Sequence, residues 1–457
     1  MRPTRPIPAL LLLVVSLLVT VGAQEKPKHE EPPPEVPLAQ WLAAGDHMDF
    51  RAEFKVMKPR LTYQQRLLVE CRATISGEIA RGRDFHMWMK VADRSGAWLP
   101  GHDYTHSAGA GALTRSNEMQ MVAGFYAQPG QYTVAIIIYD AGTHQYDIRH
   151  LPLTVEALKN DSLAAQSATD EPAVEFLEQP PPAGDTFEHI ADLSPRQTDS
   201  EWQFSKYGAI LPLAATRRPL QIDVVLDFTD HGEVEKTDTE DELRSYNDRR
   251  LPPWERRERP RGLRAEQAVV RGPAEYIADL LAIGHTLAKL QPANGCVRFS
   301  GIDMTAMNAG FRRVAPDKMD WEELRKAQTP AKGGGVSVAA LKNRKEQPLF
   351  LRDFLKGLEA PIDSCGSSAV APLHAVLFVS HRFLFPRGSH KEPFRAANPA
   401  DYRLFYWQLN EGNREHGDDL ESYLKSSEAQ VHGFEEPHRF REILAHTLAE
   451  IVTAAGK

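Results

Sequence analysis

The hydrophobic pattern of the chain changes its period once, and this change limits the possible folds more than any other feature. Between residues 48 and 157, short runs rich in alternating β-branched and aromatic residues are separated by clusters of Gly, Pro, Asp and Ser. Such runs predict strands, and a series of them without helical spacing predicts a β-sandwich. From residue 206 onward, strand-like and helix-like segments alternate. The chain of 457 residues therefore has at least two domains.

The C-terminal region has the pattern of an α/β domain. LQIDVVLDF (220–228) is almost continuously apolar, which is typical of a parallel strand covered on both faces. AEYIADLLAIGHTLAKL (274–290) has apolar residues at helical spacing, and HRFREILAHTLAEIVTAA (438–455) is an amphipathic closing helix. This order predicts a doubly wound α/β domain over residues 206–457.

The N-terminus has the layout of a secretory signal peptide. Arg2 and Arg5 form a basic start, an apolar run follows, and VGA (21–23) is a small-residue cleavage site, so residues 1–23 are expected to be removed. An uncleaved membrane anchor is the alternative, but the apolar run is short of the roughly 18–20 residues that a spanning helix needs. No later segment is long and apolar enough to span a bilayer. We expect an exported protein, periplasmic or extracellular, without a stable membrane span after cleavage.

Two polar, proline-rich segments separate these parts. Residues 24–47 are rich in Pro and Glu, and residues 158–205 lose the strand periodicity. Such composition cannot bury enough apolar surface to fold alone, so both segments are predicted to be linkers. The formal net charge of −8 argues against nucleic acid as a partner.

The three cysteines allow at most one disulfide. Cys71 lies in a strand-like run, where a small apolar side chain fits a core. Cys296 and Cys365 both lie in the C-terminal half and are the plausible pair for an oxidising compartment. Two free thiols are the alternative, and the sequence does not decide between them.

The β-rich region also carries a resemblance. PGQYTVAIIIYDAGTHQYDIRHLPLTV (129–155) is similar to the last strands of an immunoglobulin-like module, with a Pro-Gly turn before a buried strand and an Asp-Ala-Gly turn after it. The resemblance implies an all-β immunoglobulin-like sandwich over residues 48–157. Because such folds host many functions, it implies no activity.

The order of elements over residues 206–455 resembles a von Willebrand factor type A domain, as found in exported bacterial proteins that join a signal peptide and β modules to such a domain. Three local matches carry the resemblance: DFTDH (227–231), GGGVSVAALK (333–342) and AVLFVSHRF (375–383). In that family, a first strand supplies Asp-x-Ser-x-Ser, a later loop supplies Thr, and another strand end supplies Asp. The resemblance implies a magnesium site at the carboxyl edge of the sheet, with one position open to a carboxylate of a protein partner.

Several of the implied ligands are altered here. Asp227 matches the family's Asp and Thr229 its first Ser, but His231 stands where the second Ser belongs. Val336 occupies the loop Thr position, with Ser337 beside it. In the last motif, Ser380 replaces Thr and His381 replaces Asp. The resemblance therefore implies a degenerate site that has lost its magnesium affinity.

Two interpretations of this strand end stay open. In the first, the protein has no cofactor and Asp227 caps or hydrogen-bonds a loop. In the second, the site holds an ion: Mg²⁺ with altered ligands, or zinc bound by Asp227, His231 and His381, since His and Asp sets bind transition metals.

A charged insertion, residues 230–264, follows the first strand of the α/β domain. Its first part is acidic and its second part is rich in arginine. Segregated charge of this kind is typical of a solvated loop. Docking of the arginine block onto an acidic surface or a phosphate is the alternative.

These features predict an exported, noncatalytic protein of the cell envelope that binds another protein or a surface polymer, in assembly, adhesion or scaffolding. A metal-dependent adhesin with altered ligands and an extracytoplasmic hydrolase that uses the His-rich sheet edge are the alternatives. The chain has no GxSxG, HExxH or GxxxxGK[ST] motif that would favour an enzyme.

Overall fold

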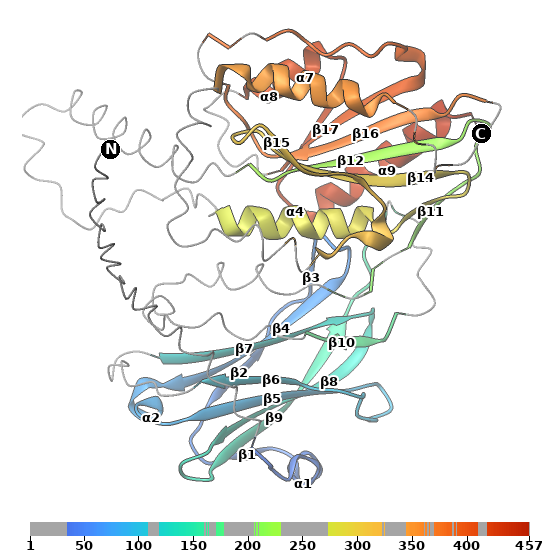
Figure 1. The fold of residues 1–457 in the computed structure, drawn as a ribbon. Helices are drawn as coiled ribbons and strands as arrows, with labels where there is room; N and C mark the ends of the chain where they lie inside the picture. The colour runs from blue at the N-terminus through green and yellow to red at the C-terminus, as the bar shows by residue number, and fades with distance from the viewer. Residues whose placement is uncertain are drawn as a thin grey trace, which may run out of the picture.

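A computed structural model describes most of the chain (Figure 1). The described residues are 34–107, 118–159, 161, 163, 171–177, 205, 207–208, 210–229, 273–321, 324, 344–360, 362, 365, 370–385, 388–389, 391–409 and 418–456. The predicted signal peptide (1–23) and the predicted charged loop (230–264) lie outside them. Of the helices that are described, none combines the length and the apolar character needed to cross a membrane.

The N-terminal domain is a sandwich of two antiparallel sheets. One sheet has the order β1-β9-β8-β5-β6, and the other has the order β10-β7-β4-β2, with β3 also paired to β4. A short helix, α2 (Gly77–Ala80), follows β4. The strands are β1 (His47–Met48), β2 (Glu53–Val56), β3 (Arg60–Leu61), β4 (Leu67–Ser76), β5 (Phe85–Ala92), β6 (Asp103–Ser107), β7 (Glu118–Ala127), β8 (Gly130–Asp140), β9 (Tyr146–Val155) and β10 (Val174–Phe176).

Alternate residues of these strands form the core between the sheets. Phe85, Met87 and Met89 of β5 and Ile136 of the neighbouring β8 face Phe125 of β7 in the other sheet, and all are fully buried. The strand-like runs between residues 48 and 157 lie on strands, because a period of two places every second side chain on the same face.

The two expected linkers are partly folded, and their boundaries need correction. Within 24–47, the apolar segment Leu38–Ala44 forms α1, and Trp41 of α1 stacks on Tyr146 at 4.2 Å between ring centroids. Within 158–205, β10 extends the second sheet by pairing with β7. Both segments are short and only partly buried against the sandwich, and their mainly polar surroundings in the sequence concealed them.

The C-terminal domain is built on a six-stranded sheet with the order β15-β14-β12-β16-β17-β18. All neighbours in this sheet are parallel except β14 and β15. A separate parallel pair joins β11 to β13. The strands are β11 (Leu211–Leu213), β12 (Leu220–Asp227), β13 (Leu290–Pro292), β14 (Gly295–Asp303), β15 (Asn308–Val314), β16 (Leu373–Ser380), β17 (Tyr402–Leu409) and β18 (Gln430–Phe434).

Helices cover both faces of this sheet, as Figure 1 shows. On one face, α4 (Pro273–Leu287) and α9 (Pro437–Ala454) pack on residues such as Val224 and Trp407. On the other face, α7 (Gln347–Leu358) and α8 (Asp419–Ser426) pack on residues such as Val225 and Phe378. The central strands β12 and β16 are consequently buried along their whole length.

A disulfide links the start of β14 to the segment before β16. Cys296, in the second position of β14, is bonded to Cys365, in the segment between α7 and β16. Cys71 lies on β4 with its side chain fully buried and is a free thiol.

The two domains meet through the turn TYQQR (62–66), between β3 and β4. The hydroxyl of Tyr63 donates to the Glu435 carbonyl at 2.7 Å, and Thr286 of α4 donates to the Tyr63 carbonyl at 2.8 Å. Gln65 accepts a hydrogen bond of 2.9 Å from Arg441 of α9. The ring of Tyr63 also packs among the core residues of the α/β domain. The turn therefore joins the sandwich to that domain.

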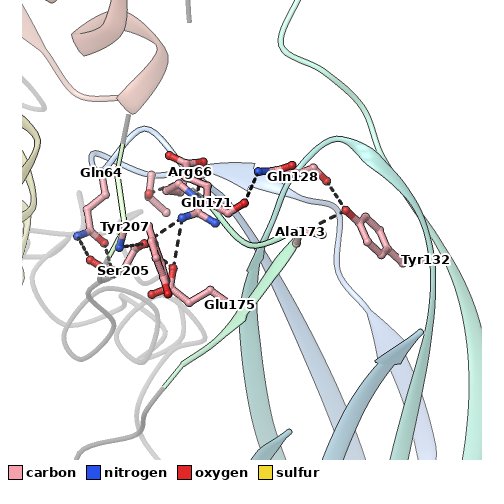
Figure 2. A network of polar contacts seen from close by, with 10 residues as sticks. Gln64, Arg66, Gln128, Tyr132, Glu171, Ala173, Glu175, Ser205 and Tyr207 are labelled. Atoms are coloured by element: carbon pink, nitrogen blue, oxygen red, sulfur yellow. Dashed lines mark hydrogen bonds and ion pairs between the residues drawn. The ribbon is translucent and has the colours of Figure 1, made fainter. Parts of the chain in front are cut away.

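Figure 2 shows how the same turn contacts strand β10, the residues just before it and Ser205. Arg66 donates to Glu175 at 3.3 Å and to Ser205 Oγ at 3.2 Å, and its Nε lies 3.7 Å from Glu171. Gln64 accepts the Ser205 amide proton at 2.8 Å. The Arg66 side chain is only 3 % exposed, so these carboxylates neutralise a charge that would otherwise be buried without a partner.

Candidate functional site at the carboxyl edge of the sheet

Three of the residues that match the A-domain motif meet at the carboxyl edge of the sheet. Asp227 ends β12 and Ser380 ends the neighbouring parallel strand β16, so the two strands deliver them to the same edge. Ser380 Oγ donates to Asp227 Oδ2 at 2.7 Å. Thr229 donates to Asp227 Oδ1 with its hydroxyl and also with its amide, the latter at 3.1 Å. These three residues are called the edge cluster below.

The edge cluster is closed to solvent. Asp227 and Ser380 are fully buried, and Thr229 is 1 % exposed. The Thr229 hydroxyl, besides donating to Asp227, accepts the amide proton of Met304 at 2.7 Å. Each hydroxyl therefore serves the carboxylate of Asp227 instead of facing outward.

Burial controls the charge of the carboxylate. The pKa of Asp227 is raised to about 6, mainly by loss of solvent and also by the nearby charge of Asp303, at the end of β14. The hydrogen bonds from Thr229 and Ser380 favour the ionised form and partly offset this rise. Without these donors, the carboxyl group would be protonated over a still wider pH range.

The imidazole of His381, a predicted metal ligand, makes a local contact. Its Nδ1 atom lies 2.7 Å from the carbonyl oxygen of the next residue, Arg382, so this nitrogen is engaged locally. The backbone carbonyl oxygen of His381 lies 2.8 Å from Ser380 Oγ and competes with Asp227 for the single proton of that hydroxyl. A zinc site built on Asp227 and His381 would have to use Nε2 of the ring or break this contact of Nδ1.

The other predicted ligands lie outside the described residues. His231 follows Asp227 by four positions, and Ser337 lies in the glycine-rich loop. Their contribution to the site therefore stays a prediction.

Sequence reasoning missed a second buried carboxylate at this edge. Asp418 accepts hydrogen bonds from Gln408 at 2.6 Å and from Tyr406 at 3.1 Å, and it caps α8 through the Leu420 amide at 2.9 Å. Burial raises the pKa of Asp418 as well. The signal was present in the sequence, because Asp at the start of an amphipathic segment is a preferred N-cap residue.

The two carboxylates belong to one chain of contacts. The Tyr406 hydroxyl lies 3.1 Å from the His381 carbonyl oxygen and 3.1 Å from Asp418, while the same carbonyl lies 2.8 Å from the Ser380 hydroxyl. Asp227 and Asp418 are thus linked by hydrogen-bonding groups along the ends of β12, β16 and β17. This arrangement places carboxylate and hydroxyl groups close together. None of the three side chains of the edge cluster is accessible to solvent.

The fit of a magnesium ion to the edge cluster is poor in this arrangement. Carboxylate and hydroxyl oxygens are suitable ligands, and Mg²⁺ demands nearly ideal octahedral geometry. Here the Thr229 oxygen already accepts a backbone proton and donates its own, and both it and Ser380 are shielded from solvent. An ion at this place would have no open position toward a partner unless the cluster rearranged.

Comparison with known proteins gives little guidance. No protein-family model matches the chain, and no curated protein matches it. A conjugate transposon protein fragment from Bacteroides vulgatus has 10 % sequence identity and a TM-score of 0.12, over 23 % of this chain and 84 % of the fragment. A β-glucuronidase from Bacteroides uniformis has 8 % identity and a TM-score of 0.18, over 82 % of this chain and only 38 % of the enzyme. At such TM-scores, neither similarity carries an argument about fold or function.

Proposed function

We propose that this chain is an exported, noncatalytic binding protein of the cell envelope, in which an A-domain-like domain acts as a scaffold without a metal centre. The observation that carries the proposal is the closed edge cluster, in which both hydroxyls donate to Asp227. The hydroxyls of Thr229 and Ser380 form hydrogen bonds inside the protein and so stabilise the strand ends. Such a cluster keeps the A-domain motif as a structural element.

The arrangement of the domains supports a scaffold. The turn 62–66 joins the sandwich to the α/β domain. Arg441 and Asp161 add an ion pair to this contact, with nitrogen–oxygen distances of 2.6 Å. Two domains held at several points present a preformed surface, which lowers the entropy cost of binding a partner.

The disulfide supports export. Disulfides persist in the periplasm and outside the cell and are rare in the cytosol. The bond between Cys296 and Cys365, together with the basic-apolar-small pattern of residues 1–23, favours the periplasm or the extracellular space.

The test compares metal dependence with partner binding. The mature chain, residues 24–457 without an affinity tag, is immobilised and used to capture envelope proteins and polymers, with chelator in one sample and Mg²⁺ in the other. An identified partner is then purified and titrated by calorimetry. We expect one-to-one binding whose Kd is the same in chelator and in Mg²⁺, and the same for Asp227→Asn.

Matched variants make the outcome decisive. Asp418→Asn alters the other buried carboxylate of the same edge and serves as the control for Asp227→Asn. Turnover of the captured partner, or failure to obtain any stoichiometric partner, would reject the proposal.

A metal-dependent adhesin is the second candidate, because one observation favours it. The oxygens of Asp227, Thr229 and Ser380, three of the positions that would ligate the ion, do meet within hydrogen-bonding distance. This function predicts that Mg²⁺ or Mn²⁺ raises the Tm of the wild-type protein and not of Asp227→Asn, since an ion that binds the native state stabilises it. Partner binding would then be lost in chelator and restored by Mg²⁺.

A further inference from the structure

A second candidate site lies on the sandwich, on the outer face of the sheet that contains β5 and β6. His86 on β5 and His106 on the edge strand β6 are directly opposite each other in this antiparallel pair. Asp84 precedes β5, two positions before His86. Residues two apart on a strand share a face, and opposite residues of neighbouring strands do too, so the backbone brings these three side chains together.

The side chains converge through their donor atoms. Asp84 Oδ1 lies 2.6 Å from His106 Nε2, and Asp84 Oδ2 lies 3.7 Å from His86 Nε2. The two imidazole rings are stacked, with 4.5 Å between centroids and 9° between planes, so both rings direct Nε2 to the same carboxylate. One carboxylate oxygen and the two nitrogens all lie within 4.8 Å of one another.

A further contact orients the ring of His86. Its Nδ1 atom lies 2.8 Å from the hydroxyl of Tyr104, the β6 residue opposite Trp88. When Nδ1 carries the proton and donates it to this oxygen, Nε2 is left with a lone pair directed at Asp84. Histidines that bind metal ions use a partner of this kind to orient the ring.

We propose that Asp84, His86 and His106 form a binding site for a divalent transition-metal ion of the zinc class. Two imidazole nitrogens and one carboxylate oxygen are the donors that zinc prefers, and they suit neither Mg²⁺ nor Ca²⁺. Ligand atoms about 2.1 Å from a tetrahedral ion are about 3.4 Å apart, and the distances of 2.6 and 3.7 Å lie on either side of this value. The two distances go to different oxygens of Asp84, and side-chain rotation would bring the three donor atoms, now within 4.8 Å of one another, to this spacing.

Exposure allows an ion to enter and to keep water. The side chain of His86 is 9 % exposed, whereas those of His106 and Asp84 are 33 % and 44 % exposed. One ligand is therefore anchored in the aromatic surface of the sheet, and the other two open to solvent. Water completes the coordination, and the ion ties the edge strand β6 to β5.

The site is independent of the edge cluster. It lies in the other domain, and its donors are nitrogens, which the edge cluster lacks among its three side chains. Zinc affinity and partner binding are measured separately, so failure of one proposal does not decide the other.

The experiment is a titration of tag-free, chelator-treated residues 24–457 with Zn²⁺ by calorimetry, and with Co²⁺ by visible absorption. We expect one ion per chain and, for Co²⁺, the absorption bands of a nitrogen- and oxygen-ligated ion. His106→Ala should weaken Zn²⁺ binding by about 100-fold or more, because even loss of an outer partner costs 10–100-fold. His106 is on an edge strand and partly exposed, so its removal leaves the fold intact, and circular dichroism and Tm verify this.

Two further variants sharpen the assignment. Tyr104→Phe removes the partner of His86 Nδ1 and should weaken Zn²⁺ binding by about tenfold. His150→Ala is the matched control: His150 also pairs with a carboxylate, Asp46 at 2.9 Å, but belongs to no such trio among the described residues, so affinity should stay unchanged.

Three outcomes would overturn the proposal: no Zn²⁺ binding by the wild type, the same Kd in His106→Ala as in the wild type, or equal losses in His150→Ala and His106→Ala.

Discussion

Ser380 Oγ lies 2.7 Å from Asp227 Oδ2, although 153 residues separate them in the sequence. Both residues end parallel strands, β16 and β12, which are neighbours in the centre of the sheet. The contact turns a motif that resembles a metal site into an internal hydrogen-bond cluster. The proposed noncatalytic role depends on this closure.

The first prediction concerns the hydroxyl of Ser380. Ser380→Ala leaves the buried carboxylate of Asp227 without one of its donors, which should lower the free energy of unfolding by about 1–3 kcal/mol. The same change should raise the pKa of Asp227 further, because that hydrogen bond favours the ionised form. Urea denaturation measures the first effect, and carboxyl NMR of labelled Asp measures the second. A pKa of Asp227 that falls or does not move would show that Ser380 does not donate to it.

The second prediction concerns the pH dependence that Asp227 causes. Its pKa is about 6 in the folded protein, against 3.8 for the ordinary group, so the folded state binds the proton more tightly. The stability contributed by protonation is fully present below pH 3.8 and is lost as the pH rises through about 6. The difference in unfolding free energy between wild type and Asp227→Asn should therefore fall over this window. Parallel curves for the two proteins from pH 4 to 7 would contradict the expected shift.

The third prediction concerns Asp103, a carboxyl group of the sandwich whose pKa is also raised. Asp103, at the start of β6, is 2 % exposed, and burial raises its pKa to about 7 despite hydrogen bonds from the amides of Gly124 and Tyr104. Its contribution to stability should be lost as the pH rises from about 4 to about 7, and Asp103→Asn should remove this trend. Asp93 is the control of opposite sign. The Ser95 hydroxyl lowers the pKa of Asp93, whose contribution is lost as the pH falls. Equal pH profiles for the two Asn variants would refute the assignment.

The fourth prediction concerns the contact between the domains. Arg441 donates two hydrogen bonds of 2.6 Å to Asp161, and its side chain is 7 % exposed while that of Asp161 is 27 % exposed. Arg441→Ala should lower the free energy of unfolding by about 2–3 kcal/mol, less than for a fully buried pair. Arg439→Ala removes an exposed pair of the same helix, with Glu442, and should cost under about 0.5 kcal/mol. Equal effects in the two variants would show that the Arg441 contact does not stabilise the docking.

The fifth prediction concerns the cysteines. Replacing Cys296 and Cys365 together by Ala should lower the free energy of unfolding by up to about 4 kcal/mol, because the bond closes a loop of 69 residues in the unfolded chain. Alkylation of the denatured wild-type protein should label only Cys71 before reduction and all three cysteines after it. In the native protein Cys71 should not react, since burial raises the pKa of its thiol. Three labels without reductant would exclude the disulfide.

The strongest hydrophobic patterns gave accurate strands. The runs EMQMVAGFYA and GQYTVAIIIYD coincide with β7 and β8 at both ends. Their alternating or continuous apolar residues lie in buried central positions, where the pattern and the pleat agree. The shorter, half-buried strands β6, β15 and β18 were not predicted, because an edge strand needs few apolar residues.

Local sequence patterns are enough to predict the two kinds of domain, the central strand that carries Asp227 and the candidate cysteine pair. These follow from local periodicity and composition, which survive whatever the neighbouring segments do. Only the tertiary structure decided that Ser380 and Thr229 donate to Asp227, that the imidazole of His381 bonds Arg382, and that Asp84, His86 and His106 meet. Side-chain direction at a strand end depends on sheet order, register and loop conformation, and these are fixed by contacts between residues far apart in the sequence.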